Sequence, residues 1–145
     1  MLHIKTWEEL TKEELYSLLK LRQQIFVLEQ LCPFVDNDDY DQSSIHLWFE
    51  HYGEMVAYGR IVPPGTEFKE LSVGQFVTAE GHRGKGLGRT VVQGCLDEAF
   101  SRFGRQPVKI TAQWVYVNFY RSFGFEPVGE EFHLDHIPHL YMILD

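Results

Sequence analysis

The chain has 145 residues, of which 44% are hydrophobic and 23% are charged, and its formal net charge is −8 at pH 7. This size and composition are typical of one globular domain and argue against disorder, so we expect a single domain over residues 1–145. The acidic balance argues against nucleic acid as the main partner, and no apolar run approaches the roughly 20 residues of a membrane helix. The first ten residues lack the apolar run of a secretory signal, so a cytoplasmic protein is expected.

The first part of the chain predicts a strand, a capped helix and a hairpin. Residues 4–7 are a candidate strand, and Thr11 and Glu14 have the spacing of a capping box. Apolar residues then recur at helical spacing, which predicts a helix to about Glu29. Two further strands, 45–50 and 55–62, are expected to form a hairpin about a Tyr-Gly turn.

An acidic run, Asp36 to Gln42, lies between that helix and the hairpin. It lacks the turn glycine and the final Glu of an EF-hand, so it is expected to be a solvated loop or, alternatively, a rim that attracts a cationic amine. Arg60 lies on an otherwise apolar strand and needs a partner. Glu29 is the expected partner, and a substrate carboxylate is the alternative.

The segment from residue 71 to residue 103 carries the most informative pattern. A strand over 71–78, with a bulge expected at Gly74, precedes a turn with glycines at positions 84, 86 and 88 and a helix that ends at Gly104. Free amides at a helix N-terminus, backbone access at glycine and basic side chains together predict an anion site. Neither the P-loop nor the dinucleotide spacing fits, and a flexible charged loop is the alternative.

The remaining elements complete an α/β sandwich with a mixed sheet. A strand over 108–112, a short helix over 114–123 and two closing strands over 125–131 and 140–144 are expected. His133, His136 and His139 are evenly spaced, but three-residue spacing on an extended chain sends alternate side chains to opposite faces, so no metal is expected. Cys32 and Cys95 have no disulfide or metal spacing and are expected to be structural thiols.

Several motifs resemble the GCN5-related N-acetyltransferases, the GNAT superfamily. The R-x-x-G-x-G run at Arg83 resembles the acetyl-CoA pyrophosphate loop, and Gln113 with the run 119–125 resembles a second GNAT motif. The run F-V-L-E-Q-x-C-P at 26–33, His46, A-x-x-R at 57–60 and I-P-H-x-x-M at 137–142 are similar to the ElaA-type branch. The resemblance therefore covers nearly the whole chain.

The resemblance implies a mixed, mostly antiparallel sheet with helices on both faces and a splayed central strand pair that forms the acetyl-CoA cleft. It implies a set of acetyl-CoA contacts on the strand before the loop, the loop itself and the second motif: Phe76, Val77, Thr78, Arg83, Gly84, Lys85, Gly86, Leu87, Gly88, Arg89, Gln113 and Tyr120.

The same resemblance suggests catalytic roles. A backbone amide near Thr78 would stabilise the oxyanion, and Tyr120 would protonate the thiolate, unless Tyr120 is only a core aromatic residue. Gln75 stands where some members carry a catalytic Glu. The candidates for the base are therefore Glu29, His46 and His139, each with a purely structural role as the alternative.

These observations predict an acetyl-CoA-dependent N-acetyltransferase that acts by direct transfer in a ternary complex. The net charge favours a small primary amine or a lysine-like group as the acceptor. The alternatives are a non-catalytic acyl-CoA-binding or regulatory module, and a protein that binds another nucleotide. The sequence leaves open whether the chain forms a homodimer.

Overall fold

The computed structural model describes residues 1–145 and contains one seven-stranded sheet with strand order β1-β2-β3-β4-β5-β7-β6. Every pair of neighbouring strands is antiparallel except β4 and β5, which are parallel. The sheet is thus mixed and mostly antiparallel, as expected. Its strands are β1 (Leu2–Thr6), β2 (Ile45–His51), β3 (Glu54–Val62), β4 (Leu71–Thr78), β5 (Val108–Gln113), β6 (Glu126–Leu134) and β7 (Ile137–Leu144).

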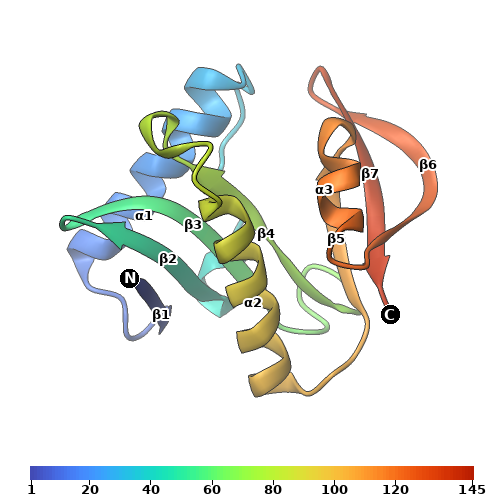
Figure 1. Cartoon of the computed structure of the whole chain (residues 1–145), viewed down its shortest axis with the longest axis horizontal. Coiled ribbons are helices and arrows are strands. Elements are labelled where there is room, and N and C mark those ends of the chain that lie inside the picture. The colour runs from blue at the N-terminus through green and yellow to red at the C-terminus, as the bar shows by residue number, and fades with distance from the viewer.

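Helices cover both faces of this sheet (Figure 1). The capping box at the start of α1 (Lys12–Arg22) is confirmed, because Thr11 and Glu14 satisfy each other's backbone amides. The expected helix changes to π-helical geometry after Arg22, in η1 (Gln23–Glu29). The other helices are α2 (Leu87–Phe103), α3 (Val117–Arg121) and the short 3-10 segments η2 (Asp41–Ser43), η3 (Glu80–His82) and η4 (Trp114–Tyr116).

Successive side chains along each strand point to opposite faces of the sheet, so the core has two layers, one on each face. Leu18 of α1 packs with Trp48 and Tyr58 on one face, whereas α2 packs on the other face through an apolar stripe that includes Val91 and Cys95. Gly59 allows α2 to approach β3, since a Cβ at this position would lie 2.8 Å from the side chains of Phe76 and Val91. None of the helices has the length and apolar character needed to cross a bilayer.

The β4 strand diverges from β5 near the middle of the sheet. The two strands pair only at Leu71 with Val108 and Ser72 with Lys109, and beyond these residues they separate (Figure 1). A bulge distorts β4 at the same place, because Gly59 of β3 faces both Gln75 and Phe76. The bulge is next to Gly74, where it was expected, and Gln75 adopts a φ of 54°.

The closing hairpin is longer than predicted. The expected strands, 125–131 and 140–144, stop short of the turn, but β6 and β7 pair as far as Leu134 and Ile137. His133 pairs with Pro138, His136 lies in the turn and His139 lies within β7. Nowhere in the chain do three His, Cys, Asp or Glu side chains form a group that could hold a metal ion.

Candidate active site

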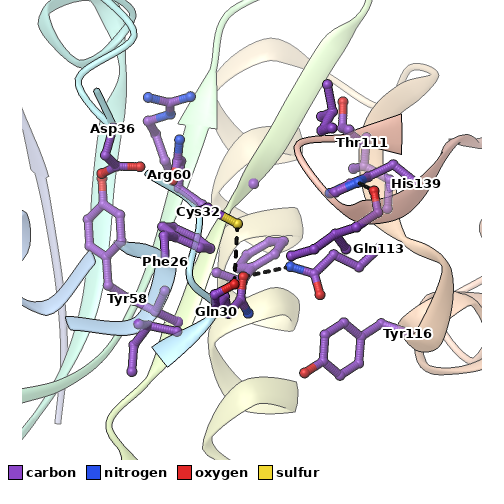
Figure 2. Close-up of a pocket in the computed structure, with 18 of the residues that line it drawn as sticks. Phe26, Gln30, Cys32, Asp36, Tyr58, Arg60, Thr111, Gln113, Tyr116 and His139 are labelled. Carbon is purple, nitrogen blue, oxygen red and sulfur yellow. Dashed lines mark hydrogen bonds between the residues drawn. The ribbon is translucent and has the colours of Figure 1, made fainter. Parts of the chain in front are cut away.

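A cavity of about 600 Å³ occupies the gap between β4 and β5. Figure 2 shows Phe26, Cys32 and Tyr58 on one side of it and Gln113 and His139 on the other. A hydrogen bond of 2.9 Å from the Gln113 amide to the Gln30 side chain connects the two sides. The cavity reaches from the glycine loop to the loops before β2 and β4.

The glycine loop has the geometry of an anion site. Gly84 and Gly86 have φ angles of 77° and 78°, which are readily adopted only by glycine. Gly86 is the N-cap of α2 and supplies no side-chain cap, so the first amides of α2 remain available for a ligand. Arg83 and Gly88 line the cavity, and Lys85 is exposed on the loop between them.

Arg83 bonds to Glu29 in the free protein. Its two terminal nitrogens donate to the Glu29 carboxylate at 2.9 and 2.6 Å, and its Nε donates to the Thr78 carbonyl oxygen at 3.2 Å. The hydrogen bonds from Arg83 lower the pKa of Glu29. Glu29 is therefore a weak base in this state, and its partner is Arg83 rather than the predicted Arg60.

Arg89, which was predicted to contact the cofactor, joins α2 to α3. Its guanidinium donates to the Ser122 hydroxyl at 2.7 Å and lies over the rings of Phe119 and Phe123. These contacts direct the side chain toward α3, and Arg89 does not line the cavity.

Strand geometry leaves the backbone of Thr78 available on the cavity side. The Ala79 amide donates to the Val56 carbonyl at 2.8 Å, so the next pair, Thr78 with Ala57, is of the non-hydrogen-bonded type. The amide and carbonyl of Thr78 therefore point away from β3, and the carbonyl accepts from Arg83. By the same alternation, the backbone groups of Val77 point toward β3, while the Val77 side chain packs with α1.

Tyr120 combines a packed ring with an unpaired hydroxyl. The ring lies beside Phe76, Phe119 and Phe125, at centroid separations of 5.3 to 6.3 Å. Tyr120 lines the cavity, and its hydroxyl makes no hydrogen bond within the protein. Burial raises the pKa of Tyr120, so the hydroxyl remains a proton donor at neutral pH.

The two candidate histidines differ in access to the cavity. His46 is fully buried and does not line it: its Nε2–H donates to the Asp41 carbonyl at 2.9 Å, and its Nδ1 accepts from the Tyr58 hydroxyl at 2.6 Å. In His139, Nδ1–H donates to the Ile137 carbonyl at 2.8 Å, which leaves Nε2 unprotonated in the neutral ring. His139 lines the cavity and has the tautomer that a base requires.

Three of the four aspartates in the acidic run pair with arginines, so they form neither a solvated loop nor an amine-attracting rim, and Asp39 alone is exposed without an ion-pair partner. Asp36 and Asp41 are only 6% and 5% exposed and both bond to Arg22, at 2.7 and 2.8 Å. Arg60, 2% exposed, bonds to Asp38 and Asp41 at 2.7 and 2.9 Å. Two buried guanidiniums require these carboxylates as counterions, which a reading of local composition missed.

Sequence reasoning also missed Glu67 in the loop between β3 and β4. Its carboxylate lines the cavity and has no ion-pair or hydrogen-bond partner in the protein, and burial raises its pKa. No motif surrounds this residue, so no signal in a single sequence identifies it. Gln30, by contrast, lies within the run at 26–33 that carried the resemblance.

Comparison with known proteins identifies the family. A family model described as an acetyltransferase (GNAT) domain matches residues 10–145. The chain belongs to the GNAT acetyltransferase family. Protein ElaA of Escherichia coli is 36% identical over 136 residues, which cover 92% of this chain and 89% of ElaA. A UPF0039 protein of Synechocystis is 34% identical over 138 residues, which cover 94% and 90% of the two chains.

Solved structures agree with this assignment. An acyl-CoA N-acyltransferase from Pseudomonas aeruginosa superposes with a TM-score of 0.96 at 33% identity, over 100% of this chain and 99% of that chain. The E. coli ElaA structure superposes with a TM-score of 0.94 at 33% identity and the same coverage. The predicted GNAT fold and the ElaA-type relationship are confirmed, and the family makes this chain an acyltransferase.

Proposed function

We propose that this GNAT protein transfers the acetyl group of acetyl-CoA to a primary amine by direct attack in a ternary complex. One observation carries the proposal: a continuous cavity reaches from the glycine loop to Tyr120, Thr78 and His139 through the splay of β4 and β5. Acetyl transfer needs a phosphate site, an oxyanion donor, a base and an acid along one path, and these residues supply such groups.

The residues at the loop fit the pyrophosphate of acetyl-CoA. The free amides of α2 and the glycine backbone leave room for phosphate oxygens, and Arg83 and Lys85 add positive charge. Arg83 exchanges Glu29 for phosphate when the cofactor binds. The backbone of Phe76 and Thr78 lines the arm of the ligand, and Gln113 lies on the opposite wall.

The chemistry follows from three groups. The Thr78 amide stabilises charge on the carbonyl oxygen as the amine attacks, and His139 Nε2 accepts the proton of the ammonium directly or through water. Tyr120 donates its proton to the departing thiolate, which its raised pKa permits. Burial raises the pKa of the Cys32 thiol, so it is a poor nucleophile, in keeping with direct transfer.

Two measurements test this function. Calorimetry with acetyl-CoA, CoA and ATP should give binding of the first two ligands and none of ATP. Release of the CoA thiol should then depend on both an amine and the protein. CoA binding without transfer to any amine would favour the non-catalytic acyl-CoA-binding module, and preferential binding of ATP would favour a nucleotide-binding protein.

A further inference from the structure

The end of the cavity remote from the glycine loop lies where β4 and β5 still pair. Side chains alternate along each strand, and Val73 and Ile110 pack toward α2. Ser72 and Thr111 therefore point to the α1 side of the sheet, and both line the cavity. Neither hydroxyl makes a hydrogen bond within the protein, although Ser72 is only 3% exposed. Both hydroxyls are thus available to a ligand.

Arg60 adds an unpaired donor at the same end. It lies opposite Gly74 of β4, where an added Cβ would contact no atom within 4 Å, so there is open space beside Arg60. The terminal nitrogens of Arg60 donate to Asp38 and Asp41, but its Nε has no hydrogen-bond partner in a residue that is only 2% exposed. A buried donor without an acceptor is costly, and the carboxylate of a ligand satisfies it.

The loop before β4 places a carboxylate next to these donors. Glu67 lines the cavity and has no ion-pair or hydrogen-bond partner. Its neighbour Phe68 packs edge to face on Tyr141 at 5.7 Å, and Tyr141 pairs with Thr111, so the loop covers this part of the sheet. Burial raises the pKa of Glu67 and the charge of Arg60 opposes the shift, which indicates that the two side chains are near each other. Glu67 can therefore receive an ammonium group beside the donors for a carboxylate.

The net charge of this region is negative. Two buried guanidiniums, those of Arg22 and Arg60, bond to three carboxylates, those of Asp36, Asp38 and Asp41. Glu67 is a fourth carboxylate. A ligand that brought only a carboxylate would add to the excess negative charge, whereas a ligand with one carboxylate and two ammonium groups would reduce it.

The reaction centre lies one step along β5 from these groups. Gln113 is the next residue after Thr111 on the same side of the strand, and it pairs with His139, the proposed base. Two residues of a strand span about 7 Å. The side chain of lysine spans about 6 Å from Cα to Nζ. A free lysine with its α-carbon beside Thr111 therefore brings its side-chain nitrogen to His139.

Resting on the proposed function, we propose that the acceptor is a free diamino acid of the length of lysine, acetylated on its side-chain nitrogen. Its α-carboxylate accepts hydrogen bonds from Arg60 Nε and from the hydroxyls of Ser72 and Thr111. Its α-ammonium donates to Glu67. A lysine within a protein chain is disfavoured, because its α-nitrogen and its carbonyl belong to neutral peptide groups and leave Glu67 without a cation.

Three probes of equal chain length test this assignment: lysine, cadaverine, which lacks the carboxylate, and ε-aminocaproate, which lacks the α-ammonium. We expect kcat/KM for lysine to exceed that of each of the others by roughly tenfold or more, the effect of losing one charge-assisted interaction. Mass spectrometry should locate the acetyl group on the side-chain nitrogen. Equal or better use of a truncated probe, or acetylation of the α-nitrogen, would overturn the assignment.

Two variants connect each charged group of the ligand to a residue. Glu67→Gln should raise the KM for lysine by about tenfold and leave the KM for ε-aminocaproate nearly unchanged, since that probe has no α-ammonium. Glu70→Gln, in the same loop but outside the cavity, is the matched control. Ser72→Ala should raise the KM for lysine but not for cadaverine, which has no carboxylate. Variants that affect lysine and the truncated probes equally would contradict the assignment.

Direct binding distinguishes this inference from the proposed function. Lysine binding is measured by calorimetry in the presence of CoA, on the wild-type protein and on Glu67→Gln. Binding that is weakened by the substitution, without any acetylation by the wild type, would support the diamino acid site and refute the transfer reaction. Acetylation of other amines without measurable lysine binding would support the reaction and overturn the assigned acceptor.

Discussion

Arg83 contacts Glu29 in the free protein, and the same guanidinium is proposed to bind pyrophosphate. The two interactions compete because each uses the terminal nitrogens of Arg83. We expect Arg83→Gln to weaken CoA binding by about 1.5 to 3 kcal/mol, and to weaken binding of a pantetheine fragment much less. Equal losses for the two ligands, measured by calorimetry, would show that Arg83 does not bind phosphate.

Replacement of Glu29 should have the opposite effect. Glu29→Gln removes the competing carboxylate charge, so CoA should bind several-fold more tightly, and the free energy of unfolding should change little because the pair is largely exposed. Glu80→Gln, a nearby exposed acid that makes no ion pair, is the control. Weaker binding of CoA by Glu29→Gln would mean that Glu29 helps to orient Arg83 for the ligand.

A substitution at Tyr120 can distinguish the packing of its ring from the proposed chemical role of its hydroxyl. Tyr120→Phe retains the ring contacts with Phe76 and Phe125 and removes only the hydroxyl. The melting temperature and CoA affinity should remain close to those of the wild type, while kcat falls by on the order of 100-fold. Full activity in this variant would refute the role as an acid, and loss of folding would assign Tyr120 to the core.

At the scale of elements, the loop before β2 is held by buried charge. Asp41 bonds to both Arg22 of α1 and Arg60 of β3, so it links a helix to the sheet. Asp41→Asn should lower the free energy of unfolding by about 3 to 5 kcal/mol, the cost of leaving a buried charge without its partner. Asp39→Asn is the control, since Asp39 is exposed and Asn tolerates its φ of 68°. Equal stability of the two variants in urea titrations would contradict this account.

The buried side chain of His46, which bonds to the Asp41 carbonyl, makes the free energy of unfolding depend on pH. Burial lowers the pKa of His46 below its ordinary value of 6.5. As the pH falls, the unfolded chain therefore binds a proton at this residue before the folded chain does. The stabilisation is complete above about pH 6.5 and decreases as pH falls, with a slope of at most about 1.4 kcal/mol per pH unit. His46→Gln should reduce this slope in urea titrations between pH 7.5 and 5.5. An unchanged slope would show that other groups dominate.

At the scale of the whole molecule, local patterns were sufficient for most of the fold. The Tyr-Gly turn marked the hairpin of β2 and β3, the capping box marked α1, and the glycine loop marked the start of α2, because each signal lies within a few residues. The ion pairs of Arg22 and Arg60 join residues 14 to 22 positions apart through a loop without periodicity. No local pattern specifies such contacts, so the acidic run was misread and Arg60 was given the wrong partner.

The residues of the site, like those of the fold, could be predicted from the sequence only where they belong to a local motif. The proposed cofactor end lies on a contiguous motif, and its residues could be named from the sequence. The rest of the cavity gathers Asp36 and Glu67 from two loops and Leu134 from the end of β6, and only the fold brings them to one cavity. Loops carry specificity in many enzymes, and their composition alone does not reveal which side chains share a cavity.

The central claim is that the acetyl group passes directly from acetyl-CoA to an amine. The most direct test uses acetyl-CoA labelled in its acetyl group in a rapid-quench single turnover with excess protein and an amine. Label should leave acetyl-CoA and appear in the N-acetyl product at the same rate, with none on the protein. Label that remains in bound acetyl-CoA, or that accumulates on the protein before it reaches the amine, would contradict direct transfer.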